Sequence, residues 1–117
     1  MRYMLLIGSD KTEVPTAPPS EAAMQELVQA HARFGEELRA KGKLVEAHRL
    51  RPDTDASRVR AKAGHHLVTD GPFAETKEIL GGFYLIECDS KPEAIEWAKK
   101  LPAREGTFVE VRPIWIM

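Results

Sequence analysis

Two kinds of hydrophobic spacing alternate along the chain and predict a domain that contains both strands and helices. Residues 3–8 are apolar at consecutive positions, which is typical of a strand covered on both faces. After Ser20, apolar residues instead recur every three or four positions, which indicates an amphipathic helix. Ser20 is a good N-cap, and Gly42 favours a helix end near Lys41.

The rest of the chain repeats this alternation and gives a predicted topology. Ser90 and Glu93 have the spacing of a capping box and predict the start of a second helix. Further strands are expected over residues 43–50, 82–87 and 107–117, with a hairpin of residues 58–63 and 65–69 around Gly64. The order is β-α-β, a hairpin, then β-α-β. This order predicts an α+β fold, a ferredoxin-like βαβ repeat with an inserted hairpin, as a single domain over residues 1–117.

The faces of the predicted sheet suggest how the domain is covered. Right-handed crossovers place both helices on one face of the sheet. The other face is also apolar, because Met4 and Leu6 alternate with Tyr3, Leu5 and Ile7. A large uncovered apolar face marks an interface, and a second copy related by two-fold symmetry is the simplest cover. We therefore expect a homodimer.

Composition narrows the class of protein. The net charge of −1 over 117 residues favours neither nucleic acid nor a membrane surface as a direct partner. The apolar runs are too short to span a bilayer, and the start of the chain lacks the pattern of a signal peptide. Cys88 has no second cysteine with which to form a disulfide, which suits a reducing compartment, so we expect a cytoplasmic protein.

Cofactor and metal sites are not expected. The adjacent residues His65 and His66 would point to opposite faces of a strand, and Cys88 has no histidine or cysteine at ligand spacing. No glycine-rich phosphate loop and no nucleophile elbow is present in the sequence. Any chemistry would then rest on ordinary side chains.

His31 is the leading candidate for such chemistry. It falls within the apolar stripe of the first helix, between Val28 and Leu38. A histidine there is either a hydrogen-bonded core residue that fixes the helix to the sheet, or a general acid/base oriented by a carboxylate.

Two aspartates are candidate partners of His31. Asp10 follows the first strand, and Asp70 opens the Asp-Gly-Pro-Phe turn at the end of another strand. Either carboxylate could project into a cleft as a base or as the group that orients His31. The simpler alternative for Asp70 is that its side chain binds the backbone N–H groups of its own turn.

Cations gather on two predicted strands. Arg58, Arg60 and Lys62 share one strand face because they are spaced by two, and Arg49 and Arg51 lie on a nearby strand by the same rule. They could attract a carboxylate or phosphate. They could equally form a solvated face that protects an edge strand.

The central segment resembles a known family. The sequence LVTDGPFAETKE at residues 67–78, followed by LGGFYLI at 80–86, closely resembles the signature of the DGPF proteins, which belong to the YCII-related family. Residues 2–7, 31–42 and 109–113 are also similar to that family, so the resemblance covers nearly the whole chain.

The resemblance implies a ferredoxin-like fold that dimerises into an α+β barrel. It also implies a cleft that holds a histidine of the first helix and an aspartate as an acid/base pair. His31 matches the histidine, Asp10 best matches the aspartate, and Asp70 belongs to the signature itself. The long loop before the first helix and the added hairpin depart from the simplest family members, so no substrate is carried over.

Three functions are compatible with these features. The first is a cofactor-independent acid/base enzyme of the lyase or isomerase type, which acts on a small anionic metabolite through a His31–aspartate pair. Its candidate substrate-binding residues are Phe73, Arg49 and Arg60. The second is a non-enzymatic binding module linked to transcriptional regulation, since DGPF-like proteins are commonly encoded beside sigma factors. In the third, His31 and Asp70 have structural roles only.

Overall fold

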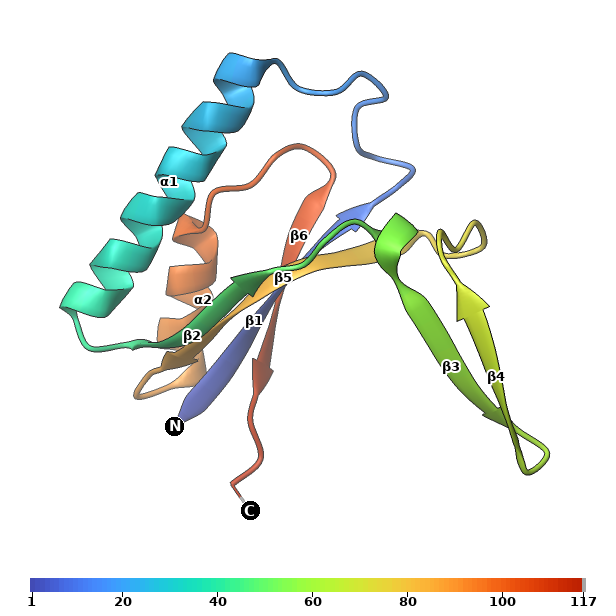
Figure 1. The fold of residues 1–117 in the computed structure, drawn as a ribbon. Coiled ribbons are helices and arrows are strands. Elements are labelled where there is room, and N and C mark those ends of the chain that lie inside the picture. Colours follow the sequence, from blue (N-terminus) through green and yellow to red (C-terminus); the bar gives the residue numbers. More distant parts are fainter. Residues whose placement is uncertain (117) are drawn as a thin grey trace.

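The two helices lie on one face of a four-stranded antiparallel sheet (Figure 1). The computed structural model describes residues 1–116. The strands of this sheet follow the order β2-β5-β1-β6. This arrangement is consistent with the ferredoxin-like α+β fold predicted from the sequence. The elements are β1 (Arg2–Asp10), α1 (Glu21–Ala40), β2 (Leu44–Arg49), a short 3-10 helix (Asp53–Asp55), β3 (Ser57–Lys62), β4 (His65–Asp70), β5 (Glu78–Glu87), α2 (Lys91–Lys100) and β6 (Thr107–Pro113).

The hydrophobic core lies between the helices and the sheet. Side chains that alternate along β1 and β5 pack against both helices, because every second residue of a strand faces the same side. Cys88, just after β5, is a free cysteine in this core, and burial raises the pKa of its thiol to about 11. The buried members of the core are Tyr3, Leu5, Phe34, Leu38, Tyr84, Ile86, Cys88, Ala94, Trp97 and Leu101.

The ends of the helices agree with the capping residues in the sequence. The Ser20 side chain accepts a hydrogen bond from the backbone N–H of Ala23 at 3.1 Å. The Ser90 side chain accepts one from the N–H of Glu93 at 3.3 Å. Gly42 follows α1 with a φ of 67°, a left-handed conformation that glycine adopts without strain.

Two strand boundaries differ from the prediction. β5 begins at Glu78 rather than at residue 82, because Gly81 is the extra residue of a bulge between pairs that join Ile7 to Gly82 and Gly8 to Leu80. β6 ends at Pro113, since its partner β1 begins at Arg2 and offers no strand beyond that point. The last residue of the strand predicted over 107–117 lies outside the described residues.

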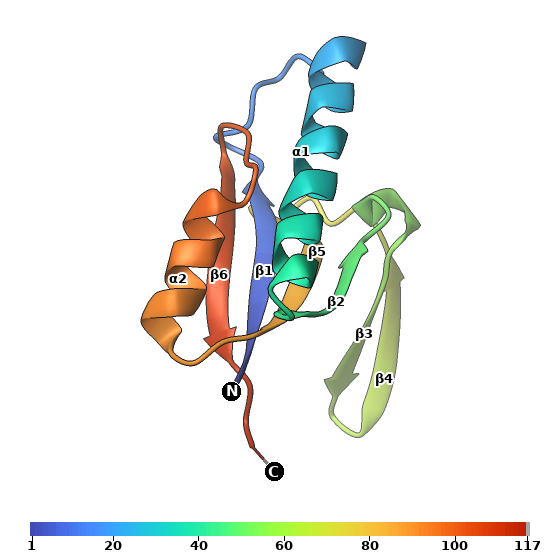
Figure 2. The ribbon, with the colours of Figure 1, turned by 90° about the vertical axis from the view of Figure 1, so that its left-hand side faces the viewer.

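β3 and β4 form a separate two-stranded sheet that projects away from the rest of the molecule (Figures 1 and 2). The radius of gyration is 16.2 Å, compared with about 13 Å for a compact domain of this length. The Asp-Gly-Pro-Phe turn anchors the base of this hairpin. The Gly71 N–H donates to the carbonyl of Ala56 at 2.7 Å, and Lys11 Nζ donates to the carbonyl of Phe73 at 2.8 Å.

Candidate functional site

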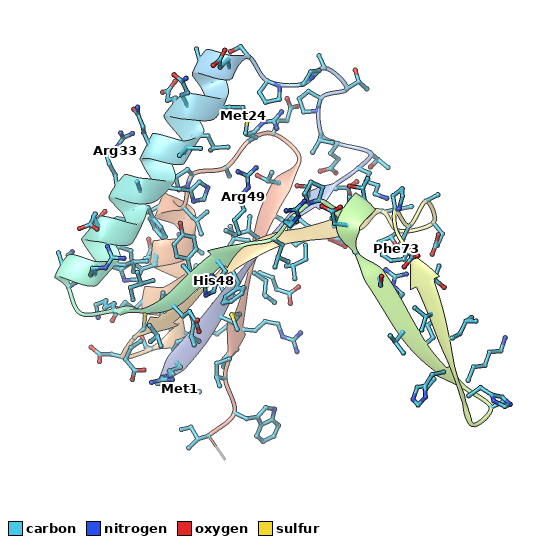
Figure 3. The ribbon with its side chains drawn as sticks, in the orientation of Figure 1. Met1, Met24, Arg33, His48, Arg49 and Phe73 are labelled. Carbon is cyan, nitrogen blue, oxygen red and sulfur yellow. The ribbon has the colours of Figure 1, made fainter. Side chains whose placement is uncertain are left out.

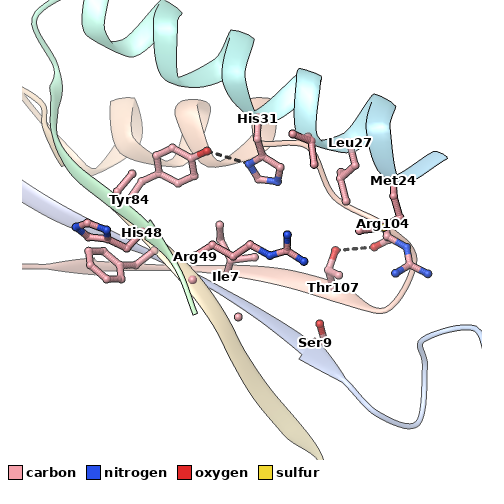
Figure 4. Close-up of a pocket in the computed structure, with 15 residues that line it drawn as sticks. Ile7, Ser9, Met24, Leu27, His31, His48, Arg49, Tyr84, Arg104 and Thr107 are labelled. Atoms are coloured by element: carbon pink, nitrogen blue, oxygen red, sulfur yellow. Dashed lines mark hydrogen bonds between the residues drawn. The ribbon is translucent and has the colours of Figure 1, made fainter. Parts of the chain in front are cut away.

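A cleft of about 470 Å³ opens between the first half of α1 and the sheet (Figure 4). α1 forms one wall, and the ends of β1, β2 and β6 with the middle of β5 form the floor. The cleft is lined by Ile7, Ser9, Met24, Leu27, Val28, His31, Ala47, His48, Arg49, Gly81, Gly82, Phe83, Tyr84, Arg104 and Thr107.

The apolar stripe of α1 lies partly in the hydrophobic core and partly in the cleft. Phe34 and Leu38, in the second half of the helix, are buried in the core. Leu27 and Val28, in the first half, line the cleft instead, and Val28 is 56% exposed. His31 lies where the stripe passes from the core to the cleft, so it is half-buried rather than enclosed.

Tyr84 is the hydrogen-bond partner of His31. His31 Nδ1 and Tyr84 Oη are 2.9 Å apart, and the two rings lie nearly parallel at an interplanar angle of 8°. Burial and the nearby charge of Arg49 lower the pKa of His31, while burial raises the pKa of Tyr84. Both side chains are therefore mainly neutral at pH 7. A neutral imidazole keeps one ring nitrogen as a proton acceptor, which is the requirement for a general base.

Sequence reasoning missed Tyr84, although a signal was present. Tyr84 alternates with Ile86 on the helix-facing side of β5, and it is only 8% exposed. A buried tyrosine hydroxyl needs a partner. His31 was the polar residue predicted on the facing apolar stripe, so the two could have been matched.

Arg49 and Arg104 give the cleft a positive charge. Arg49 is the last residue of β2 and lies opposite Gly82 of β5. Arg104 lies in the loop before β6. The backbone carbonyl of Arg104 accepts two hydrogen bonds from Thr107, one from its N–H at 3.1 Å and one from its side-chain hydroxyl at 2.6 Å. Within residues 1–116, neither arginine forms a salt bridge and no aspartate or glutamate lines the cleft. The cleft therefore favours anions.

The structure does not bring either candidate aspartate to His31. The Asp10 carboxylate accepts hydrogen bonds from the N–H and hydroxyl of Thr12 at 2.8 and 2.6 Å, and these bonds lower its pKa. Asp70 accepts a hydrogen bond from the hydroxyl of Ser57 at 2.7 Å. Both carboxylates accept hydrogen bonds from neighbouring residues at strand ends, and neither aspartate lines the cleft.

Of the three residues predicted to bind substrate, the cleft contains Arg49 alone. Phe73 is buried beneath the guanidinium of Arg58, which lies 4.0 Å from the ring centroid, at the base of the hairpin (Figure 3). It borders a smaller hollow of about 240 Å³. Arg60 lies on β3, 4.0 Å from a carboxylate oxygen of Glu75. The signature turn thus anchors the hairpin and does not line the His31 cleft.

Metal-binding clusters and membrane-spanning helices are two further features by which the chain can be classed. Within the described residues 1–116, no three histidine, cysteine or acidic side chains are grouped so that they could hold a metal ion. In the same part of the chain, neither helix combines the length and hydropathy of a transmembrane span.

Comparison with known proteins assigns the chain to a family. The model of the YCII-related domain matches residues 1–117. An uncharacterised protein of Rhizobium meliloti (strain 1021) is 40% identical over 119 residues, a match that covers 97% of this chain and 92% of that protein. The chain belongs to the YCII-related family.

Proposed function

We propose that the cleft binds a small organic anion and that His31 transfers a proton to or from it without a bound cofactor. The observation that carries this proposal is the His31–Tyr84 pair, a half-buried neutral imidazole hydrogen-bonded at 2.9 Å inside a cleft that also contains Arg49.

Tyr84 takes the place that an aspartate was expected to fill. It engages Nδ1 of His31, which leaves Nε2 as the ring nitrogen for a substrate. A phenol hydroxyl both donates and accepts hydrogen bonds. When Nδ1–H donates to the Tyr84 hydroxyl oxygen, Nε2 is the basic nitrogen; the same Nδ1–H bond persists after Nε2 takes a proton, so Nε2–H can then return it as an acid. Such a pair suits isomerisation or elimination, in which a proton leaves one position and is delivered to another.

The test follows carbon–hydrogen exchange with solvent. Small carboxylic and keto acids are incubated with the protein in D₂O, and deuterium incorporation is followed by NMR. His31→Gln should abolish any exchange that the parent catalyses, while its circular dichroism stays unchanged. His66→Gln is the matched control, because His66 is an exposed residue of β4 on the projecting hairpin and does not line the cleft. Full exchange by His31→Gln would refute the role of the imidazole.

We also propose that the protein forms a homodimer in which two copies pack together through the sheet face opposite the helices. Leu6 pairs with Phe83 across β1 and β5, and both are only partly buried because, within residues 1–116, both helices lie on the other face of the sheet. Glu110 and Arg112 on β6 add both signs of charge to this face, so two copies can complement one another.

Light scattering after size-exclusion chromatography tests this assembly. The parent should have the mass of a dimer. Leu6→Lys should give a monomer, whereas Ile95→Lys, at an exposed apolar position of α2, should leave the dimer intact. A monomeric parent at micromolar concentration would refute the proposal.

A further inference from the structure

We infer that the ligand of the cleft is an amphipathic monoanion, with one carboxylate-like head held by Arg49 and Arg104 and an apolar body lying along the first half of α1. The inference rests on the proposed function for the location of the site, and it adds the chemical class of the ligand.

The charged end is built by strand ends and one loop on the floor of the cleft. Figure 4 shows the Arg49 side chain extending across the floor toward the end where Arg104 and Thr107 lie. Ser9 pairs with Thr107 across β1 and β6 and adds a second hydroxyl to the lining at this end. Guanidinium groups bind carboxylates through charge-assisted hydrogen bonds, and the Ser9 hydroxyl can add a donor, whereas the Thr107 hydroxyl already donates to the Arg104 carbonyl.

The position of Arg104 is fixed by its loop rather than by another charge. Thr107 holds the Arg104 carbonyl, and the Asp10 N–H donates to the carbonyl of Gly106 at 2.8 Å. Gly106 has a φ of 83°, and an added Cβ would lie 2.5 Å from the backbone nitrogen of Val14. The chain thus holds this loop closely against the segment after β1, so the Arg104 backbone is positioned before a ligand arrives.

The apolar end lies opposite, on the helix. Met24, Leu27 and Val28 present side chains at the spacing of a single helix face, and Ile7 faces them from β1. Val28 is 56% exposed, so this wall is open to solvent. Covering it with the apolar part of a ligand would favour binding, because apolar surface is removed from water. A volume of about 470 Å³ matches a small molecule and not a macromolecule.

The separation of the two ends decides between classes of anion. A ligand with a second charge at its far end would place that charge against Leu27 and Val28, which would partly desolvate it without a partner. Inorganic phosphate or acetate would satisfy the arginines but leave the apolar wall exposed. A single charged head on an apolar body satisfies both ends. His31 and Arg49 line the same cleft, so we place the reacting carbon near the head group.

Isothermal titration calorimetry with defined probes tests the class. The probes are octanoate, its uncharged isostere octanamide, octanedioate, acetate and inorganic phosphate. We expect the parent to bind octanoate, and to bind each of the other four at least about tenfold more weakly. Octanamide loses the charge-assisted contact, acetate and phosphate lose the apolar contact, and octanedioate adds a charge that has no partner. Equal binding of octanamide or of phosphate would overturn the inference, as would no binding of octanoate.

Variants place the probe in the cleft. Arg49→Gln and Arg104→Gln should each weaken octanoate binding about tenfold or more. Arg51→Gln, at an exposed arginine two residues from Arg49, should leave it unchanged. Octanoate binding that survives both cleft variants would overturn the inference. Proton exchange by the parent is measured separately, and octanoate that binds in the cleft without exchange of any ligand proton would uphold the ligand class while it counts against the acid/base role. Failure of the binding class and failure of the acid/base role are therefore distinguished.

Discussion

Two leucines of α1 should respond very differently to truncation, because the apolar stripe of this helix is divided between core and cleft. Leu38 is fully buried in the core, whereas Leu27 lines the cleft and is only partly buried. Leu38→Ala and Leu27→Ala remove the same atoms from the same helix, so helix propensity cancels between them. The comparison isolates the environment of each side chain.

The expected magnitudes follow from what surrounds each leucine. Removing a fully buried leucine costs the lost transfer free energy plus the cost of a cavity, in total about 3–5 kcal/mol. Leu27→Ala opens space into an existing cleft and creates no new cavity, so it should cost less than about 2 kcal/mol. For a domain of this length, the loss at Leu38 corresponds to a fall in Tm of roughly 12–20 °C.

Urea denaturation followed by tryptophan fluorescence and circular dichroism measures both variants. Leu27→Ala should retain most of the stability of the parent while weakening octanoate binding. Leu38→Ala should show the reverse, a large loss of stability with binding intact at low temperature. Equal losses of stability in the two variants would refute the division of the helix into a core half and a cleft half.

Three further predictions follow. Tyr84→Phe removes the hydrogen bond to His31 and should lower the free energy of unfolding by about 0.5–1.5 kcal/mol in urea titrations; an unchanged value would show that the bond is not formed in solution. Gly35→Ala should raise that free energy by about 0.5–1 kcal/mol, since an added Cβ would meet no atom within 4 Å, and a loss would show that the helix is packed there. Lys43 pairs with Glu93 at 2.8 Å and holds the pKa of the Glu93 carboxyl at about 2, below its ordinary value of 4.5. The stability that this pair contributes is therefore present above pH 4.5 and is lost as the pH falls from 4.5 toward 2. Urea titrations across this range should show that loss for the parent and a smaller one for Glu93→Gln; identical slopes would contradict the assignment.

The fold was largely predictable because its determinants are local. Helix starts at Ser20 and Ser90 depend on side-chain caps within three residues, and strand positions depend on apolar spacing along each segment. The start of β5 was placed four residues late, since the glycine pair 81–82 gives the same sequence signal whether it ends a loop or forms a bulge.

The site was only half predictable because it depends on which distant residues meet. The sequence indicated His31 and Arg49, because a histidine within an apolar helix stripe and an arginine near the end of a strand can be recognised from residue type and position. Tyr84 reaches the same cleft through the register of the sheet, and Arg104 reaches it through the path of the loop before β6. Local residue spacing predicts neither of these. Asp10 sits at a strand end as expected, but its carboxylate is held by Thr12, a contact that depends on the path of the loop.

The buried thiol of Cys88 has a practical consequence for solution measurements. Burial raises the pKa of this thiol to about 11, so very little thiolate forms near neutral pH, and the side chain is only 2% exposed. A cysteine introduced at an exposed position, such as Leu67 on the projecting hairpin, would react with maleimide or nitroxide reagents while Cys88 stays unmodified. Single-site labelling of the hairpin is therefore possible without replacing the native cysteine, and distances between the labels would measure the separation of the two hairpins in the proposed dimer.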